Sequence, residues 1–214
     1  MNVLVTGASR GIGLAVAERF LAAGHRVWGV DRRPAALAHP AYVHVQGDIR
    51  EITVDVPDLA VLVNNAGTLE EEEAIEVNLA GTMAFTQRHI LSPALKSLVF
   101  VASASARNGA EFPRYVASKA GLVGYMKNLA LTLAKRGVTV NSVSPGGVVT
   151  PANRHILESP ALYDAVKAET LLGKWAQPEE VAELVYYLSA VNRSITGEDI
   201  LMDNGEQLKS NFIW

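Results

Sequence analysis

The chain has 214 residues, 49% of them hydrophobic, and a formal net charge of −3 at pH 7, so we expect a single domain over residues 1–214 with one good core. Its lysines and arginines are scattered and no apolar run approaches the roughly 18 to 20 residues of a membrane span, so neither nucleic acid nor a membrane is predicted as a partner. The absence of cysteine excludes disulfides and thiolate metal sites and fits a cytoplasmic protein. The five histidines are dispersed, and we predict no metal.

Short β-branched runs alternate with longer helical stretches along the chain. Strands are expected at 2–6, 25–30, 41–45, 59–64, 97–102, 138–143 and 199–202. Helices are expected at about 11–23, 69–90, 113–136 and 178–190, with a further one near 160–168. The alternation predicts an α/β fold with a doubly wound, mostly parallel seven-stranded sheet and helices on both faces. The connection between the third and fourth strands is too short for a full crossover helix, so it should be abbreviated.

Three glycines separate the first strand from the first helix, in "VTGASRGIG" (5–13). Gly7, Gly11 and Gly13 indicate a tight turn that leads into a helix N-terminus, where backbone N–H groups and the helix dipole favour a pyrophosphate. Their spacing is G-x-x-x-G-x-G rather than the G-x-G-x-x-G of the standard dinucleotide fingerprint. A tight turn without a ligand is the alternative interpretation.

Acidic and amide side chains follow the next strands. Asp31 ends the second strand, where a carboxylate can accept hydrogen bonds from an adenosine ribose, although it could also simply open the turn before "RRPA". Asp48 ends the third strand in "QGD", and "NNAG" (64–67) ends the fourth. Ligands bind at this carboxyl edge in open α/β sheets, so the positions predict a dinucleotide site.

The candidate chemistry lies in "SASARNGAEFPRYVASKAGLVGY" (103–125). Tyr115 and Lys119 are four positions apart on a predicted helix, so their side chains can converge. A nearby cation favours the phenolate and lowers the pKa of a tyrosine, which makes the pair a proton-transfer device. Ser103 follows the fifth strand and could bind the same substrate oxygen. The alternative is an ordinary helical pair, with a packed tyrosine and an extended lysine.

The chain resembles the short-chain dehydrogenase/reductase family in segments that run in order over nearly its whole length. These are "TGASRGIG" (6–13), "NNAG" (64–67), "IEVNLAGT" (75–82), Ser103, "YVASK" (115–119), "VNSVSPGGVVT" (140–150) and "ITGEDILMDNG" (195–205). The resemblance implies a Rossmann-type fold and an oxidoreductase that transfers a hydride between a nicotinamide and a carbonyl or secondary alcohol. In this family a tyrosine is the general acid/base, a lysine binds the nicotinamide ribose and lowers the tyrosine pKa, a serine orients the substrate oxygen, and an asparagine supports a proton relay through water. The matching positions are Tyr115, Lys119, Ser103 and Asn78.

The resemblance also implies a cofactor site along the carboxyl edge of the sheet. Its residues would be Gly7, Ser9, Arg10, Gly11, Ile12, Gly13, Asp31, Arg32, Asp48, Ile49, Asn65, Ala66, Gly67, Tyr115, Lys119, Pro145, Gly146, Val148 and Thr150. NAD is the expected cofactor, because a carboxylate at Asp31 accepts from the ribose hydroxyls and repels a 2′-phosphate. NADP is the alternative, because the nearby Arg10, Arg32 and Arg33 could clamp that phosphate.

Two features depart from the family pattern. Ser103 lies twelve positions before Tyr115, one fewer than the commonest spacing, and Ser105 supplies a second hydroxyl nearby. We prefer Ser103 because it directly follows the strand. The chain is also short after "NNAG", where "TLEEEEA" leads straight into a helix with Thr68 and Glu71 spaced as a capping box. An unusually open substrate cleft is expected.

Segment 151–177 is expected to form a substrate lid, since long excursions in a compact domain are usually functional. The helix at 113–136 carries more apolar and small residues than one stripe facing the sheet needs, so we expect a homodimer or homotetramer. The apolar tail 212–214 could cover a neighbouring subunit or the cleft of its own subunit.

The predicted function is an NAD(P)-dependent oxidoreductase with a small carbonyl or alcohol substrate. A non-catalytic dinucleotide-binding sensor or scaffold on the same fold is the alternative. It is disfavoured because a binding protein does not need the pair of Tyr115 and Lys119.

Overall fold

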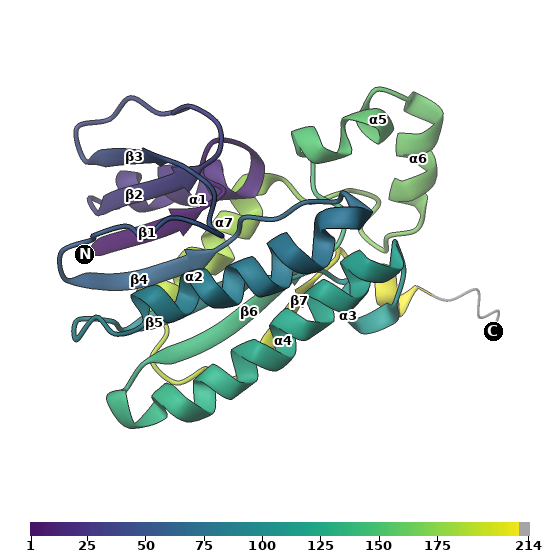
Figure 1. The fold of residues 1–214 in the computed structure, drawn as a ribbon. Coiled ribbons are helices and arrows are strands. Elements are labelled where there is room, and N and C mark those ends of the chain that lie inside the picture. Colours follow the sequence, from purple (N-terminus) through teal and green to yellow (C-terminus); the bar gives the residue numbers. More distant parts are fainter. Residues whose placement is uncertain (210–214) are drawn as a thin grey trace.

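The computed structural model describes residues 1–209 and shows one sheet between two layers of helices (Figure 1). The strands are β1 (Asn2–Thr6), β2 (Arg26–Asp31), β3 (Tyr42–Gln46), β4 (Leu59–Asn64), β5 (Ser97–Val101), β6 (Thr139–Pro145) and β7 (Asp199–Met202). Their order is β3-β2-β1-β4-β5-β6-β7 and every neighbouring pair is parallel, which confirms the doubly wound fold. The predicted apolar tail lies outside the described residues.

The strands are apolar throughout because both faces of the sheet are covered. Helices α1 (Gly11–Ala22) and α7 (Pro178–Tyr186) pack on one face, where alternate residues of β1 such as Val3 enter the core. Helices α2 (Thr82–His89) and α4 (Pro113–Leu133) cover the other face, which buries Leu4. Figure 1 shows these two helices on the same side of the sheet.

The connection between β3 and β4, residues 47–58, contains no helix, as predicted. It packs as an extended segment instead, with Val54 and Val56 buried against the core under α2 and α4. The backbone N–H of Val54 donates to Nε2 of His89 (3.1 Å), and Nδ1 of His89 contacts the Phe85 carbonyl (2.7 Å). Burial lowers the pKa of His89, so the ring is held neutral. The His89 side chain thus ties this segment to α2 by one hydrogen bond.

The single helix predicted over 69–90 is interrupted. A 3-10 turn at Glu71–Glu73 is followed by a π-helical stretch at Ile75–Gly81 and only then by α2. The capping box predicted at Thr68 and Glu71 is wrong: Thr68 Oγ1 accepts from the Glu70 N–H (3.0 Å), and no side chain caps the 3-10 turn. The carboxylate of Glu71 has other partners, described below.

The remaining helices follow the predicted positions. Helix α4 continues as a 3-10 turn at Ala134–Arg136, and Gly137 in the left-handed region ends it. Helix α7 continues as a π turn at Tyr187–Val191, and α6 (Pro160–Ala168) lies where a further helix was expected. Short helices α3 (Ser105–Asn108) and α5 (Arg154–Leu157) were not predicted. In residues 1–209 no helix has the length and apolarity needed to cross a membrane.

Segment 151–177 leaves the sheet after β6, and its last residues return to the short stretch that directly follows β6. Its end is fixed by hydrogen bonds between Ala176 and the backbone of Gly147 and Val149 (3.0 and 2.9 Å). Between these ends α5 and α6 stand away from the sheet (Figure 1), and no residue from 151 to 169 is buried. This placement is consistent with a lid, although the lid function stays a prediction.

Candidate active site

The glycine turn between β1 and α1 is required by contacts within the chain as well as by its backbone angles. Gly7 and Gly11 have φ values of +69° and +54°. A Cβ on Gly13 would lie 2.1 Å from the Gly7 carbonyl oxygen, and one on Gly7 would lie 2.7 Å from Nδ2 of Asn65. Asn65 Nδ2 donates to the Thr6 carbonyl (3.0 Å), which holds the turn against the segment after β4. The glycines therefore let α1 begin directly at the carboxyl edge of the sheet.

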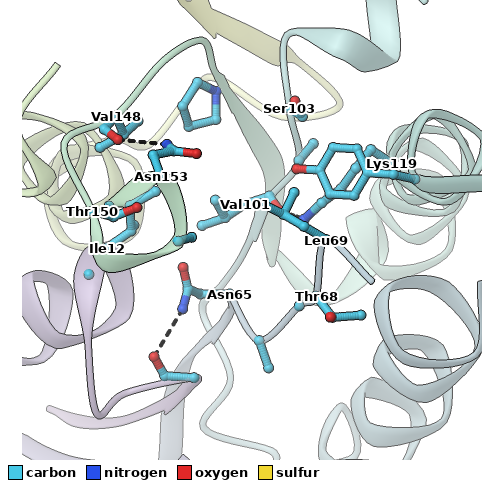
Figure 2. A pocket seen from close by; sticks show the side chains of 18 of the residues that line it. Ile12, Asn65, Thr68, Leu69, Val101, Ser103, Lys119, Val148, Thr150 and Asn153 are labelled. Atoms are coloured by element: carbon cyan, nitrogen blue, oxygen red, sulfur yellow. Dashed lines mark hydrogen bonds between the residues drawn. The ribbon is translucent and has the colours of Figure 1, made fainter. Parts of the chain in front are cut away.

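A cleft of about 770 Å³ runs along this edge, within the usual range of ligand sites. All but three of the predicted site residues line it. Figure 2 shows Ile12, Val148 and Thr150 on one side of the cleft and Ser103 and Lys119 on the other. The predicted residues that do not line it are Ser9, Gly13 and Asn78. The chain thus brings its cofactor and catalytic candidates into one continuous space.

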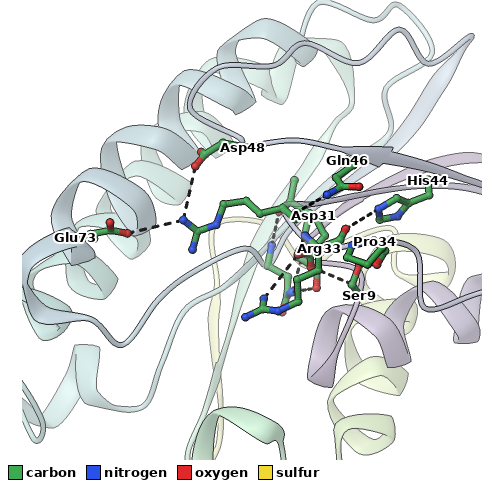
Figure 3. Close-up of polar contacts among 12 residues, drawn as sticks. Ser9, Asp31, Arg33, Pro34, His44, Gln46, Asp48 and Glu73 are labelled. Atoms are coloured by element: carbon green, nitrogen blue, oxygen red, sulfur yellow. Dashed lines mark hydrogen bonds and ion pairs between the residues drawn. The ribbon is translucent and has the colours of Figure 1, made fainter.

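Asp31 forms one end of the cleft. It is 8% exposed, and both carboxylate oxygens accept backbone hydrogen bonds, Oδ2 from Ser9 (3.0 Å) and Oδ1 from Arg33 (2.9 Å). Ser9 Oγ in turn donates to the Pro34 carbonyl (3.0 Å), so Ser9 supports Asp31 rather than the cleft surface (Figure 3). These contacts fix the carboxylate at the end of β2, which is the position predicted for a partner of the ribose hydroxyls.

The arginine side chains at the Asp31 end of the cleft pair with several acidic side chains. Arg32 Nη1 lies 3.9 Å from Oδ2 of Asp48 and 4.0 Å from Oε2 of Glu73. Asp48 accepts two hydrogen bonds from the Arg50 guanidinium (3.0 and 2.7 Å) and one from the Arg50 N–H (2.9 Å), and these lower the pKa of Asp48. Burial and the nearby charge of Arg33 lower the pKa of Arg10. The end therefore holds a buried carboxylate with a cluster of cations around it.

At the other end, Lys119 and Tyr115 extend from the first turns of α4. Lys119 is 5% exposed, its Nζ donates to the Val101 carbonyl (3.0 Å), and it lies 5.7 Å from the centre of the Tyr115 ring. Burial lowers the pKa of Lys119 to about 8, against the charge of Glu111. Burial and then Glu111 raise the pKa of Tyr115 to about 12, while a hydrogen bond with Ser103 works in the opposite direction. The phenol is therefore protonated at neutral pH in the protein alone.

The direction of the Tyr115 shift differs from the one expected from the sequence. The expectation placed a lysine cation next to the phenol, but burial dominates in the structure. A lower pKa has to come from further positive charge, such as that of an oxidised nicotinamide.

Ser103 and Ser105 both line the cleft, and the preference for Ser103 as the hydroxyl that meets the substrate stays a prediction. Ser103 directly follows β5, is 7% exposed, and its Oγ accepts from the Ser105 N–H (3.2 Å) and from Ser105 Oγ (2.9 Å). Because Ser105 fills acceptor positions of Ser103, the Ser103 hydroxyl is oriented to donate its own proton into the cleft. Ser105 is thus a supporting residue.

Asn78 lies behind the cleft surface rather than on it. Its side chain is fully buried: Oδ1 accepts from the Thr68 N–H (2.7 Å), while Nδ2 donates to the Thr68 carbonyl (3.0 Å) and to Ser118 Oγ (3.1 Å). The π-helical stretch brings this side chain to Gly67, where an added Cβ would lie 3.1 Å from Asn78 Oδ1 and 3.6 Å from Lys119 Nζ. Asn78 is therefore adjacent to Lys119, and its part in a proton relay stays a prediction.

Three carboxylates at the Tyr115 end of the cleft were missed from the sequence. Glu111, Glu169 and Glu206 line the end next to Tyr115. Desolvation raises the pKa of Glu111, against the charge of Lys119 and with a smaller rise from Glu206. Desolvation also raises the pKa of Glu206, and the charges of Asp203 and Glu169 add to that rise. Glu111 has φ +100° in the "AEFPR" segment, where the spacing from Ser103 to Tyr115 is one residue short. That short spacing was the available signal, whereas nothing in the sequence marks Glu169 and Glu206.

Comparison with known proteins places these features in one class, the NAD(P)-dependent oxidoreductases. Residues 49–207 match the family model described as enoyl-(acyl carrier protein) reductase. The chain is 32% identical to the 3-oxoacyl-(acyl-carrier-protein) reductase FabG of Aquifex aeolicus over 238 positions, covering 94% of this chain and 95% of the relative.

Solved structures agree with this class. The ligand-free aldohexose dehydrogenase of Thermoplasma acidophilum has a TM-score of 0.88 and 27% identity, with 100% of this chain and 96% of that chain covered. A 4-hydroxyisoleucine dehydrogenase mutant complexed with NADH and succinate has a TM-score of 0.84 and 25% identity, with 99% and 100% covered. The chain belongs to the short-chain dehydrogenase/reductase family and is an oxidoreductase. The comparisons give no support to the non-catalytic alternative.

Proposed function

We propose that the chain interconverts a small uncharged alcohol and its carbonyl with NAD, and that Tyr115 transfers the proton. The observation that carries the proposal is the meeting of Ser103, Tyr115 and Lys119 at one end of a cleft whose other end holds Asp31. The first three supply a hydrogen-bond donor, an acid/base and a cation, and Asp31 supplies acceptors for a ribose.

The residues divide the reaction between them. In alcohol oxidation the substrate C–H bond breaks and the hydroxyl proton goes to the Tyr115 phenolate, while Ser103 donates a hydrogen bond to the same substrate oxygen. A bound nicotinamide would accept the hydride at C4 and contribute positive charge before the transfer. Lys119 stabilises the phenolate, and Asn78 holds the backbone of Thr68, which follows Gly67 in the cleft wall. In the reverse direction neutral Tyr115 returns the proton.

The preference for NAD is supported by the environment of Asp31. Its carboxylate is buried and held by two backbone N–H groups, so it cannot readily turn away from a 2′-phosphate. Placing a phosphate dianion against a fixed carboxylate is unfavourable. Arg32 is drawn towards Asp48 and Glu73. Arg10 and Arg33 remain the residues that would favour NADP.

The charge of the reacting end supports an uncharged substrate. Glu111, Glu169 and Glu206 line it, whereas the arginines of the cleft lie at the adenosine end. A substrate carboxylate or phosphate would meet like charges in a partly desolvated space, which is costly. A sugar or polyol carries no charge to oppose these carboxylates, and its hydroxyls can donate hydrogen bonds to them. This is the substrate class that we propose.

We also propose that segment 151–177 closes over this substrate, since Ile156 and Val166 line the cleft from α5 and α6. A homodimer or homotetramer is proposed from the outer surface of α4, where Gly124 faces open space and Leu131 is 80% exposed. A cytoplasmic location is proposed from the lack of cysteine.

Initial rates of NAD reduction test the function. The substrates are matched pairs, each a sugar or polyol and the corresponding hydroxy acid with the same number of carbons. We expect kcat/KM at least about tenfold higher for the uncharged member of a pair, and higher with NAD than with NADP. Equal or better turnover of the acids would contradict the substrate class. A tenfold preference for NADP would show that the arginines outweigh Asp31.

A further inference from the structure

The first turn of α4 has an unusual cap. An α-helix leaves its first N–H groups without helical partners, and a side chain at the N-cap usually satisfies one of them. The N-cap residue here is Phe112, which has no side-chain acceptor, and Pro113 at the first position has no N–H. The Val116 N–H already donates to the Phe112 carbonyl (2.9 Å). Two donors remain, the N–H groups of Arg114 and Tyr115.

Both donors are satisfied by one carboxylate from a distant segment. Oε1 of Glu71 accepts from the Arg114 N–H (2.8 Å), and Oε2 accepts from the Tyr115 N–H (3.4 Å). The contact is reciprocal, because Arg114 Nε donates to the Glu71 carbonyl (3.0 Å) and Arg114 Nη2 to the Glu72 carbonyl (3.2 Å). The negative charge also lies at the positive end of a 21-residue helix. Glu71 therefore fills the N-cap position from outside the helix.

The four acidic residues of this segment differ in their surroundings. Glu71 is partly buried against α4, whereas Glu70, Glu72 and Glu73 are exposed. The short connection after β4 brings Glu71 to α4 directly, and a second contact anchors the same segment a turn further on. There Asn78 donates to Ser118 Oγ (3.1 Å), and Ser118 donates to the Tyr115 carbonyl (2.7 Å). The backbone of Tyr115 is thus held at its N–H by Glu71 and at its carbonyl by Ser118.

We propose that Glu71 is a positioning residue for Tyr115: its carboxylate fixes the first turn of α4 and thereby aims the phenol at the substrate oxygen. The inference rests on the proposed function, because it gives Tyr115 the proton transfer. It goes beyond that function by assigning a role to the shortened segment, which contacts the reacting residue through its backbone. Loss of the cap releases the turn that carries Tyr115 and leaves the adenosine end, about Asp31, unchanged.

The test compares the full-length protein with Glu71→Ala, Glu71→Gln and the control Glu72→Ala. Glu72 is the matched control because its side chain is exposed and only its backbone carbonyl meets Arg114. In Glu71→Ala we expect amide hydrogen exchange at residues 114 and 115 to accelerate about fivefold, the usual effect of losing a cap. We expect kcat to fall about tenfold and the NAD dissociation constant to stay within about twofold. Glu71→Gln keeps one acceptor oxygen, so its exchange rates and kcat should lie between those of the wild-type protein and of Glu71→Ala.

Two results would overturn the proposal. One is exchange in Glu71→Ala that matches Glu72→Ala, which would show that no cap is lost. The other is faster exchange with an unchanged kcat, which would make Glu71 a structural cap only. If the wild-type protein transfers no hydride to any substrate, the proposed function fails, and the ionisation of Tyr115 decides instead. Measured as an absorbance difference against Tyr115→Phe, the pKa of Tyr115, which burial raises, should fall in Glu71→Ala as the released turn exposes the phenol, and no fall would reject the positioning role.

Discussion

The two ends of the cleft are built in different ways. At the adenosine end the functional groups are strand ends and a glycine turn, and Asp31 is buried with both oxygens held by backbone N–H groups. At the reacting end the outer wall is residues 151–169, none of which is buried, and Glu111 has a backbone φ of +100°. In the proposed function, cofactor binding is thus part of the sheet framework, whereas substrate selection is assigned to segments that can vary without disturbing the core.

Among the changes that test the comparison of the two ends, the largest expected effect comes from removing the ammonium group of Lys119, which is proposed to serve both the proton transfer and cofactor binding. Lys119→Met should lower kcat/KM by about 10³-fold and weaken NAD binding as well, because the proposed ammonium contacts both the phenolate and the nicotinamide ribose. Lys127→Met, an exposed lysine on the same helix, is the control. Steady-state kinetics and calorimetric NAD binding measure the two effects. An unchanged affinity for NAD would separate Lys119 from the cofactor and sharpen the division between the ends.

A change confined to the adenosine end should alter cofactor choice alone. Asp31→Asn removes the charge and leaves one backbone N–H without an acceptor. We expect kcat/KM with NAD to fall about 10- to 100-fold and the ratio of NAD to NADP to fall with it, while kcat at saturating NAD changes little. The measurement is kinetics with both cofactors. An unchanged ratio would show that Asp31 does not select the cofactor.

A change confined to the reacting end should move the pH profile. Glu111 raises the pKa of Tyr115, so Glu111→Gln should lower that pKa and make the phenolate available at lower pH. Alcohol oxidation needs the phenolate and rises with pH, so its rising limb should move to lower pH by up to about one unit. Glu111 also raises the pKa of Lys119, which should fall in the same variant. A limb that stays in place, or moves to higher pH, would refute this electrostatic account.

The smallest expected effect is on the lid. Amide exchange in residues 151–169 should slow several-fold when NAD and a substrate alcohol are both present, because closure protects exposed backbone. Helix α7, whose Val181, Ala182 and Val185 are buried in the core, serves as the internal reference. Equal exchange with and without ligands would leave this segment as a fixed wall.

The sequence predicts the sheet and the adenosine end of the cleft well, because the patterns that mark them are local in the sequence. Period, strand length and glycine placement locate all seven strands within about two residues, and they place Gly7, Gly11 and Asp31 at one edge of the sheet. The predicted pairing of Tyr115 with Lys119 needs only helical spacing, and the structure brings both into the cleft.

The reacting end depends on contacts between distant segments, which no local pattern encodes. The sequence predicts that Glu71 belongs to a capping box of its own helix, whereas the structure turns it towards α4, 43 positions away. The helix predicted over 69–90 likewise contains a π-helical stretch at Asn78, whose side chain bonds to the Thr68 backbone. The raised pKa of Tyr115 follows from burial and from Glu111, neither of which spacing reveals. Tertiary context decides in each case.

The central claim is that binding belongs to one end of the cleft and proton transfer to the other. Tyr115→Phe tests it most directly, with NAD affinity and single-turnover hydride transfer measured on the same sample. Because the hydroxyl acts on the substrate oxygen in the transition state, the transfer rate should fall by about 10²- to 10⁴-fold while the NAD dissociation constant stays within about twofold. Wild-type turnover in this variant, or a loss of NAD binding as large as the loss of rate, would contradict the account.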